Sequence, residues 1–158
     1  MTTPAIEAVA ASGIEYGVLR HGPANSVAEA AAGQGVEVRD LAKTIVVRRA
    51  ADSYVFVLVP GDRVISWPKL RALLGVNRLS LPDAGTAKEA TGYERGTITP
   101  FGSARPWPVI VDDRLRGRRI SLGAGERGVA IRLAADDAAK VLDATFADVT
   151  DEAAKDAT

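Results

Sequence analysis

The chain has 158 residues, and its 20 lysines and arginines balance 20 aspartates and glutamates. The length suits one domain with its own core, while the absence of cysteine excludes disulfides, thiol nucleophiles and cysteine-based metal sites. Because the charges balance, no global electrostatic field draws the protein onto nucleic acid. The sequence has neither a membrane-helix nor a signal-peptide pattern, so we expect a cytoplasmic protein that does not associate with a membrane.

The first sixty residues predict short helices and strands. Thr3 and Pro4 are typical of the first turn of a helix, and Ser26 with Glu29 forms a capping box that opens a second one. In chain order the elements are a helix over 4–12, a strand over 14–19, a loop over 21–25, a helix from 27 to the glycines at 33 and 35, and a hairpin of strands 41–49 and 54–59. The last run is apolar throughout, which predicts a central strand covered on both faces.

The rest of the chain predicts more strands than helices. The elements are a helix over 67–74 capped by Ser66, a strand over 78–81, a helix over 82–90, a loop over 91–102, strands over 108–113, 118–122 and 129–133, and a helix starting at Asp136 or Asp137. We expect one domain over residues 1–150 and a polar tail over 151–158. Because strands and helices alternate only in part, the predicted fold class is mixed α/β (α+β) with a sheet that curls into a barrel, not a doubly wound parallel sheet.

The only histidine, His21, has two interpretations. It is a catalytic base of the Ser-His-Asp type, or a loop residue that makes one hydrogen bond, which is more common for a lone histidine at a strand end. We reject a metal site, because one histidine without neighbouring ligands does not supply the three or four donors of zinc. We expect no cofactor, since the glycines of 122–128 precede a strand instead of following one.

Lys43 stands at the head of the β-branched run 44–47. If Ile45 and Val47 face the interior, the period-2 alternation of a strand puts Lys43 on the same side. A buried ammonium group needs a negative or polar partner. A structural ion pair, a substrate phosphate or a polarised substrate carbonyl would each satisfy it.

Two further stretches each have two interpretations. Residues 91–102, TGYERGTITPFG, contain no histidine, cysteine or aspartate. They form either a plain loop or a cradle whose backbone N–H and C=O groups hold a ligand. The arginines at 114, 116, 118 and 119 form either a solvated hairpin or a local contact for RNA.

Four segments, in order, resemble the YbaK/prolyl-tRNA synthetase-associated domain family, whose editing domains deacylate mischarged tRNA. They are HGP (21–23), LAKTIVV (41–47), ATGYERGTITPFG (90–102) and GAGERGVAIRLAADDAAKVLDATFADV (123–149). The resemblance covers about residues 4–150. It implies a mixed, mostly antiparallel, barrel-like sheet flanked by helices.

The resemblance also implies site residues. Lys43 matches the family's functional lysine, which contacts the 3′-terminal aminoacyl-adenosine, and Gly96 to Pro100 matches the Gly-x-x-x-Pro loop, whose backbone helps to hold the aminoacyl ester. The expected catalytic positions are therefore Lys43, Gly96 and Pro100, and the expected substrate-binding residues are Thr44, Thr97, Ile98, Thr99 and His21. An aminoacyl ester is already activated, so positioning and oxyanion donors suffice, with attack by water, a ribose hydroxyl or the substrate's own side chain.

The chain departs from the cysteinyl-specific members of that family. Ala130 stands where they have an aspartate, and their aromatic pocket residues have no match at Leu19 or at 27–28. We expect a trans-editing deacylase for Cys-tRNA(Pro) or for a tRNA charged with another small amino acid. It would act at the acceptor end with help from a synthetase, since a neutral chain binds RNA weakly. The alternatives are a catalytically silent module that binds an aminoacyl or adenosine-like ligand or a synthetase, and a hydrolase of another activated ester.

Overall fold

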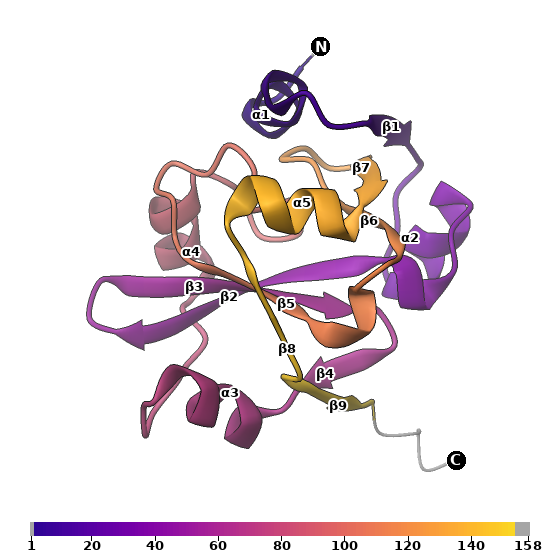
Figure 1. Cartoon of the computed structure of the whole chain (residues 1–158). Coiled ribbons are helices and arrows are strands. Elements are labelled where there is room, and N and C mark those ends of the chain that lie inside the picture. Colours follow the sequence, from indigo (N-terminus) through magenta and orange to yellow (C-terminus); the bar gives the residue numbers. More distant parts are fainter. Residues whose placement is uncertain (1, 154–158) are drawn as a thin grey trace.

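The computed structural model describes residues 2–153 (Figure 1). The α-helices are α1 (Pro4–Ser12), α2 (Val27–Gln34), α3 (Trp67–Leu74), α4 (Ala84–Thr91) and α5 (Ala135–Leu142), and two 3-10 turns are η1 (Val38–Asp40) and η2 (Asp113–Leu115). The strands are β1 (Tyr16–Arg20), β2 (Ala42–Ala50), β3 (Ser53–Pro60), β4 (Arg63–Ile65), β5 (Val109–Asp112), β6 (Arg119–Gly123), β7 (Val129–Ala134), β8 (Thr145–Ala147) and β9 (Thr150–Glu152). No helix in this part of the chain is long and apolar enough to cross a membrane.

Side-chain caps fix the helix starts as the sequence predicts. The hydroxyl oxygens of Thr3, Ser26 and Ser66 each accept a hydrogen bond from the backbone N–H three residues later. Each hydroxyl satisfies one of the N–H groups that a helix leaves unpaired in its first turn. The predicted end of the second helix at its glycines is confirmed at Gly35, which caps α2 in the left-handed conformation, whereas Gly33 lies inside the helix.

The central sheet has the strand order β2-β3-β5-β8. The predicted hairpin is confirmed as the antiparallel pair of β2 and β3, whereas β3 and β5, and β5 and β8, are parallel. Strand β3 is inside the sheet, and every residue after Ser53 is buried, as its apolar run predicts. A second, antiparallel sheet has the order β1-β7-β6, and β4 pairs with β9.

The mixed, mostly antiparallel character of the fold is confirmed, but the sheets do not close into a barrel. The strands form three separate sheets. A single parallel bridge between Leu41 and Ser121 joins the start of β2 to β6. Contact at this one point, without a continuous ladder, leaves the ends of β2 and β6 open to one side.

Two hydrophobic clusters cover the two faces of the central sheet. The larger cluster joins side chains of β2, β3 and β5 to those of α1, α5, β6 and β7. The smaller cluster joins the opposite face, including Val47 and Val57, to Leu70 of α3. Figure 1 shows α5 and α3 on the two sides of the sheet. Burial on both faces explains why β3 is a continuous apolar run.

Three further predictions about individual elements are wrong. The strand expected at 78–81 is reduced to a bridge between Ser80 and Arg48. Helix α5 begins at Ala135 without a side-chain cap, because Asp136 instead accepts a hydrogen bond from the N–H of Gly117 (2.9 Å). The short strands β8 and β9 have no counterpart in the prediction. Residues 151–152 lie in β9 and not in a tail, and the rest of the expected tail from 154 lies outside the described residues.

A buried carboxylate ties β5 to the end of the chain. Asp112 is fully buried, and its Oδ1 accepts hydrogen bonds from the N–H of Val149 (3.2 Å), the hydroxyl of Thr150 (2.9 Å) and the guanidinium of Arg114 (3.3 Å). Three donors offset the cost of burying this charge. This contact holds the segment that leads from β8 into β9.

We expect Asp112→Ala to lower the free energy of unfolding by about 3 kcal/mol, because it leaves buried donors without an acceptor. The matched control is the neighbouring Asp113→Ala. Asp113 pairs with Arg116 at the surface (3.0 Å), so this change costs less than about 1 kcal/mol. Urea unfolding measures both values, and equal losses would contradict the role assigned to Asp112.

Candidate active site

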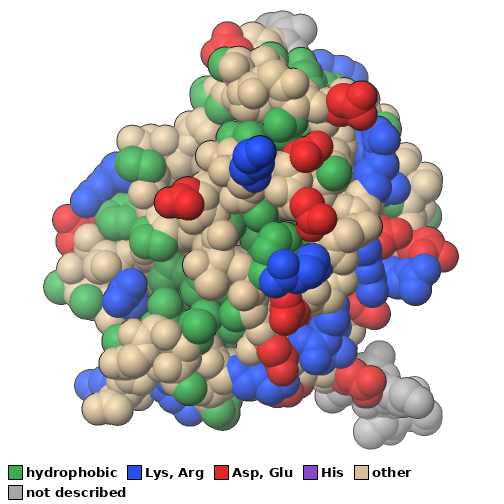
Figure 2. Space-filling model, in the orientation of Figure 1, with side chains coloured by type: hydrophobic (Ala, Val, Ile, Leu, Met, Phe, Trp, Pro, Cys, Tyr) green, Lys and Arg blue, Asp and Glu red, His purple; other side chains and the backbone are tan. Residues whose placement is uncertain are grey.

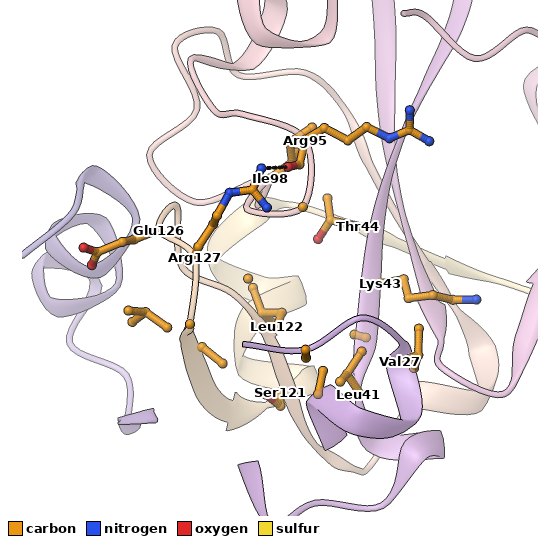
Figure 3. Close-up of a pocket in the computed structure, with 18 of the residues that line it drawn as sticks. Val27, Leu41, Lys43, Thr44, Arg95, Ile98, Ser121, Leu122, Glu126 and Arg127 are labelled. Carbon is orange, nitrogen blue, oxygen red and sulfur yellow. Dashed lines mark hydrogen bonds between the residues drawn. The ribbon is translucent and has the colours of Figure 1, made fainter. Parts of the chain in front are cut away.

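A pocket of about 1110 Å³ opens where the start of β2 approaches β6 (Figure 3). Among the described residues, its walls come from six parts of the chain that the fold brings together. They are the segment 21–27 with α2, the start of β2 with residues 41–46, the segment 81–87 that leads into α4, the loop at 95–98, β6 with residues 121–123, and the segment 126–130. The predicted site residues His21, Lys43, Thr44, Gly96 and Ile98 all line this pocket.

The side chains of Lys43 and Thr44 in β2 point to opposite faces of the central sheet. Lys43 shares its side with Ile45 and Val47, which pack in the smaller cluster, so the predicted alternation is confirmed. Thr44 lies between Ala42 and Val46, which belong to the larger cluster. Figure 3 shows the two side chains pointing apart, with Thr44 toward the pocket interior.

The ammonium group of Lys43 has a protein partner. Its Nζ donates a hydrogen bond to the carbonyl oxygen of Arg63 at 2.6 Å. Burial lowers the pKa of Lys43 below its usual value, and the nearby charge of Asp62 acts in the opposite direction. A lowered lysine pKa means that the protein stabilises the charged form less than water does, so an additional anion or carbonyl near Nζ would be favourable.

The hydroxyl oxygen of Thr44 is buried and has no hydrogen-bond partner among the described residues. A buried hydroxyl without a partner costs free energy. In Figure 3 it lies on the side of β2 that faces Ile98 and Leu122. It is therefore a polar atom in the wall of the pocket that no described residue satisfies.

The loop after α4 owes its shape to its own side chains. Gly96 has a φ of 91°, a left-handed conformation that favours glycine. The hydroxyl of Tyr93 donates to the carbonyl oxygen of Phe101 at 2.6 Å and so closes the loop. Burial raises the pKa of Tyr93 to about 12, which keeps this donor protonated. The sequence offered no signal for this role.

The loop also packs directly against the backbone of β6. A side chain at Gly123 would place its Cβ 2.8 Å from the carbonyl oxygen of Ile98 and 3.2 Å from that of Thr97. The N–H of Gly125 donates to the carbonyl oxygen of Thr97 at 3.0 Å. These contacts hold the loop opposite the start of β2, and they leave no room for a residue other than glycine at 123.

Three of the predicted loop residues do not line the pocket. Thr97, Thr99 and Pro100 are buried within the loop. The hydroxyl of Thr97 donates to the carbonyl oxygen of Glu94 (2.7 Å), and that of Thr99 accepts from the N–H of Phe101 (3.4 Å). Their side chains shape the loop, while Gly96 and Ile98 form the wall that a ligand would meet.

His21 belongs to a hydrogen-bonded chain along another wall. Ser121 donates to the Oε1 of Gln34, and the Nε2 of Gln34 lies 3.3 Å from the Nε2 of His21. Because an amide nitrogen only donates, His21 accepts at Nε2 and carries its proton on Nδ1, which donates to the carbonyl oxygen of Gly22 (2.9 Å). Both ring nitrogens are engaged, which favours the loop-residue interpretation over the catalytic base.

The pocket has one carboxylate among its lining residues, Glu126. It lies 3.9 Å from Arg20 in an ion pair. Ala130 lines the pocket and is buried at its place in β7, opposite Gly123. No three His, Cys, Asp or Glu side chains within residues 2–153 are grouped so that they could hold a metal ion.

A family model described as an aminoacyl-tRNA editing domain matches residues 21–141, which include every wall of the pocket. EbsC of Enterococcus faecalis, a candidate Cys-tRNA(Pro)/Cys-tRNA(Cys) deacylase by name, is 28% identical over 131 residues, 82% of this chain and 78% of its own. The uncharacterized protein YwhH of Bacillus subtilis is 31% identical over 68% of this chain and 69% of its own. A proline–tRNA ligase of Thermosipho africanus is 35% identical over 43% of this chain, which is only 12% of the ligase.

Solved structures share the fold. The crystal structure of a hypothetical protein has a TM-score of 0.84 and 28% identity, over 92% of this chain and 97% of its own. That of a candidate trans-editing enzyme for prolyl tRNA synthetase has a TM-score of 0.83 and 24% identity, over 92% and 93%. The fold of this chain is therefore that of the editing-domain structures.

The chain of Ser121, Gln34 and His21 predicts a non-additive pair of substitutions. Gln34→Ala should cost about 1 to 2 kcal/mol of unfolding free energy, because it leaves the buried hydroxyl of Ser121 without an acceptor. In the double variant Gln34→Ala/Ser121→Ala that hydroxyl is absent, so we expect it to be less destabilised than the sum of the single variants by about 1 kcal/mol. Urea unfolding of the four proteins measures this coupling, and strictly additive losses would contradict it.

Proposed function

The chain belongs to the aminoacyl-tRNA editing domain family, and from this premise we propose that it is a trans-editing deacylase that hydrolyses the aminoacyl ester of mischarged tRNA. The observation that carries the proposal is the meeting of Thr44 and Gly96 in one pocket, from segments about fifty residues apart. One supplies an unpartnered hydroxyl and the other a backbone that a ligand can approach closely.

The proposed chemistry asks little of side-chain acids and bases. The ester of an aminoacyl-tRNA is activated, so a pocket that positions it and donates hydrogen bonds to the developing oxyanion suffices. Thr44 and the backbone around Gly96 supply such donors. His21 is not the base, because Gln34 and Gly22 occupy its ring nitrogens. The attacking group is water, a ribose hydroxyl or the side chain of the substrate.

Lys43 has the role of a mobile cation in this proposal. In the absence of substrate its Nζ is bonded to the carbonyl oxygen of Arg63. Exchange of that single charge-assisted hydrogen bond, which contributes about 2 kcal/mol, lets the flexible side chain turn toward the terminal adenosine or its ester. The lowered pKa that burial gives Lys43 favours this exchange, since an oxygen of the substrate stabilises the ammonium form.

The proposed substrates carry a small, uncharged amino acid. Leu41, Ile98, Leu122 and Val129 give the pocket an apolar lining, and its one carboxylate is already paired with an arginine. A positively charged amino acid side chain would lose its hydration there without a partner. Cys-tRNA(Pro), named for the relative EbsC, is one candidate beside alanyl, seryl and threonyl esters. The partial match to proline–tRNA ligases supports such a ligase as the partner.

Two features favour a second candidate function, a catalytically silent module that binds an aminoacyl or adenosine-like ligand or a synthetase. Nζ of Lys43 is already bonded to protein, and Ala130 provides no carboxylate in the pocket. Hydrolysis assays with purified protein and tRNAs charged with cysteine, alanine, serine or threonine separate the two. Release of an amino acid above the rate in buffer supports the deacylase. If the folded protein releases none of the four amino acids, the deacylase proposal is refuted.

We expect Lys43→Ala to lower kcat/KM for the best aminoacyl-tRNA about 100-fold, the size of the loss on removing one oxyanion donor. Lys88→Ala is the matched control, because Lys88 is exposed, pairs with Glu94 (3.5 Å) and does not line the pocket. The control should keep the activity of the unchanged protein. Equal activity of both variants, with both folded by circular dichroism, would remove Lys43 from the reaction.

A further inference from the structure

A neutral protein that binds RNA needs a local site for phosphate groups, and the arginines at 114–119 do not provide it. Arg114 lies 2.6 Å from Asp148, Arg116 lies 3.0 Å from Asp113, and Arg118 lies 3.9 Å from Asp40. Figure 2 shows acidic and basic side chains mixed over this face of the molecule. Three of the four arginines in this run are thus paired with nearby carboxylates, which favours the solvated interpretation of the sequence.

The rim of the pocket has a different balance. Its charged lining residues are Lys43, Arg95, Arg127 and Glu126, and the last is paired with Arg20. The guanidinium of Arg95 has no hydrogen bond or ion pair among the described residues. That of Arg127 makes a single hydrogen bond within residues 2–153, to the carbonyl oxygen of Arg95 at 3.5 Å.

Both arginines are positioned by the loop of Gly96. A Cβ built at Gly96 would lie 3.6 Å from Nη1 of Arg127, so this guanidinium rests beside the glycine. In Figure 3 the side chain of Arg127 approaches the loop from the segment that leads into β7, while Arg95 extends from the loop toward the side of Lys43. The two cations therefore lie on either side of the wall that would hold the ester.

We propose that Arg95 and Arg127 bind phosphodiester groups of the RNA strand whose 3′ end carries the aminoacyl ester, an inference that rests on the proposed function. A guanidinium has five N–H donors in a planar fork that matches phosphate oxygens. A ribose ester seated beside Gly96 has its nearest phosphates on the strand that leaves the pocket, where these two side chains stand. The binding class is a single-stranded RNA end, since the ester lies at the 3′ terminus of one strand.

The test is the salt dependence of binding to an uncharged RNA hairpin with a single-stranded 3′ end. Each phosphate contact on a single strand contributes about 0.7 to the slope of log K against log salt concentration. The variant Arg95→Ala/Arg127→Ala should lower the slope by about 1.4. Between 50 and 200 mM salt this corresponds to about a sevenfold smaller loss of affinity.

Two further variants serve as controls. Arg48→Ala/Arg78→Ala removes the same charge from two arginines that have no carboxylate partner within residues 2–153 and do not line the pocket, and it should keep the slope. Arg95→Lys/Arg127→Lys keeps the charge and should restore most of the slope. If the alanine variant acted by changing the loop structure, the lysine variant would not restore the slope. An equal fall of the slope in the Arg48/Arg78 variant overturns the proposal.

A kinetic comparison separates RNA phosphate from other anions. With aminoacyl-tRNA as substrate, Arg95→Ala/Arg127→Ala should raise KM, and with an aminoacyl ester of adenosine that has no phosphate it should leave KM unchanged. If the unchanged protein hydrolyses aminoacyl-tRNA and the variant retains its KM and slope, the arginine site is refuted while the proposed function stands. If the RNA slope falls as expected but no ester is hydrolysed, the arginine site stands and the proposed function falls.

Discussion

The close contact between two stretches of backbone, residues 97–98 and Gly123, is the constraint on which the pocket depends. The carbonyl oxygens of the loop approach so near to β6 that a Cβ at Gly123 would collide with them. The contact carries no side-chain chemistry of its own. It nevertheless fixes how far Gly96 stands from β2, because Tyr93 and Phe101 close the same loop on its other side.

The geometry of β2 gives Lys43 and Thr44 different places at the opposite wall of the pocket. Successive side chains of β2 point to opposite faces, so Thr44 is placed in the pocket and Lys43 at its edge, beside β4. Neighbours in sequence thus differ in environment: one has a buried hydroxyl without a partner, and the other an ammonium group that already has one. In our proposal Thr44 is already in place to donate a hydrogen bond to the ester, whereas the side chain of Lys43 must move to reach the terminal nucleotide.

Local chemistry explains what the sequence could predict. The caps at Thr3, Ser26 and Ser66 and the alternation around Lys43 depend on residues within one turn or one strand, and the structure agrees with them. The bond between Ser121 and Gln34 joins residues 87 positions apart, and the strands β8 and β9 are three residues long. Such features arise from tertiary contacts, like those of Asp112, that no local pattern contains. The site roles of Lys43, Gly96 and Pro100 stay predictions.

Helix α2 forms a wall of the pocket and yet contributes little to the core, since Ala31 is its only buried residue. Val27 and Ala30 of α2 line the pocket and lie outside the buried core, so substitutions at these two positions change the shape of the pocket at a small cost in folding free energy. In evolutionary terms, the shape of this pocket wall can change with little effect on the stability of the domain. In our proposal, changes at these positions of α2 alter the amino acid that the pocket accepts, while Gly96 of the loop and Gly123 of β6 keep the opposite wall in place.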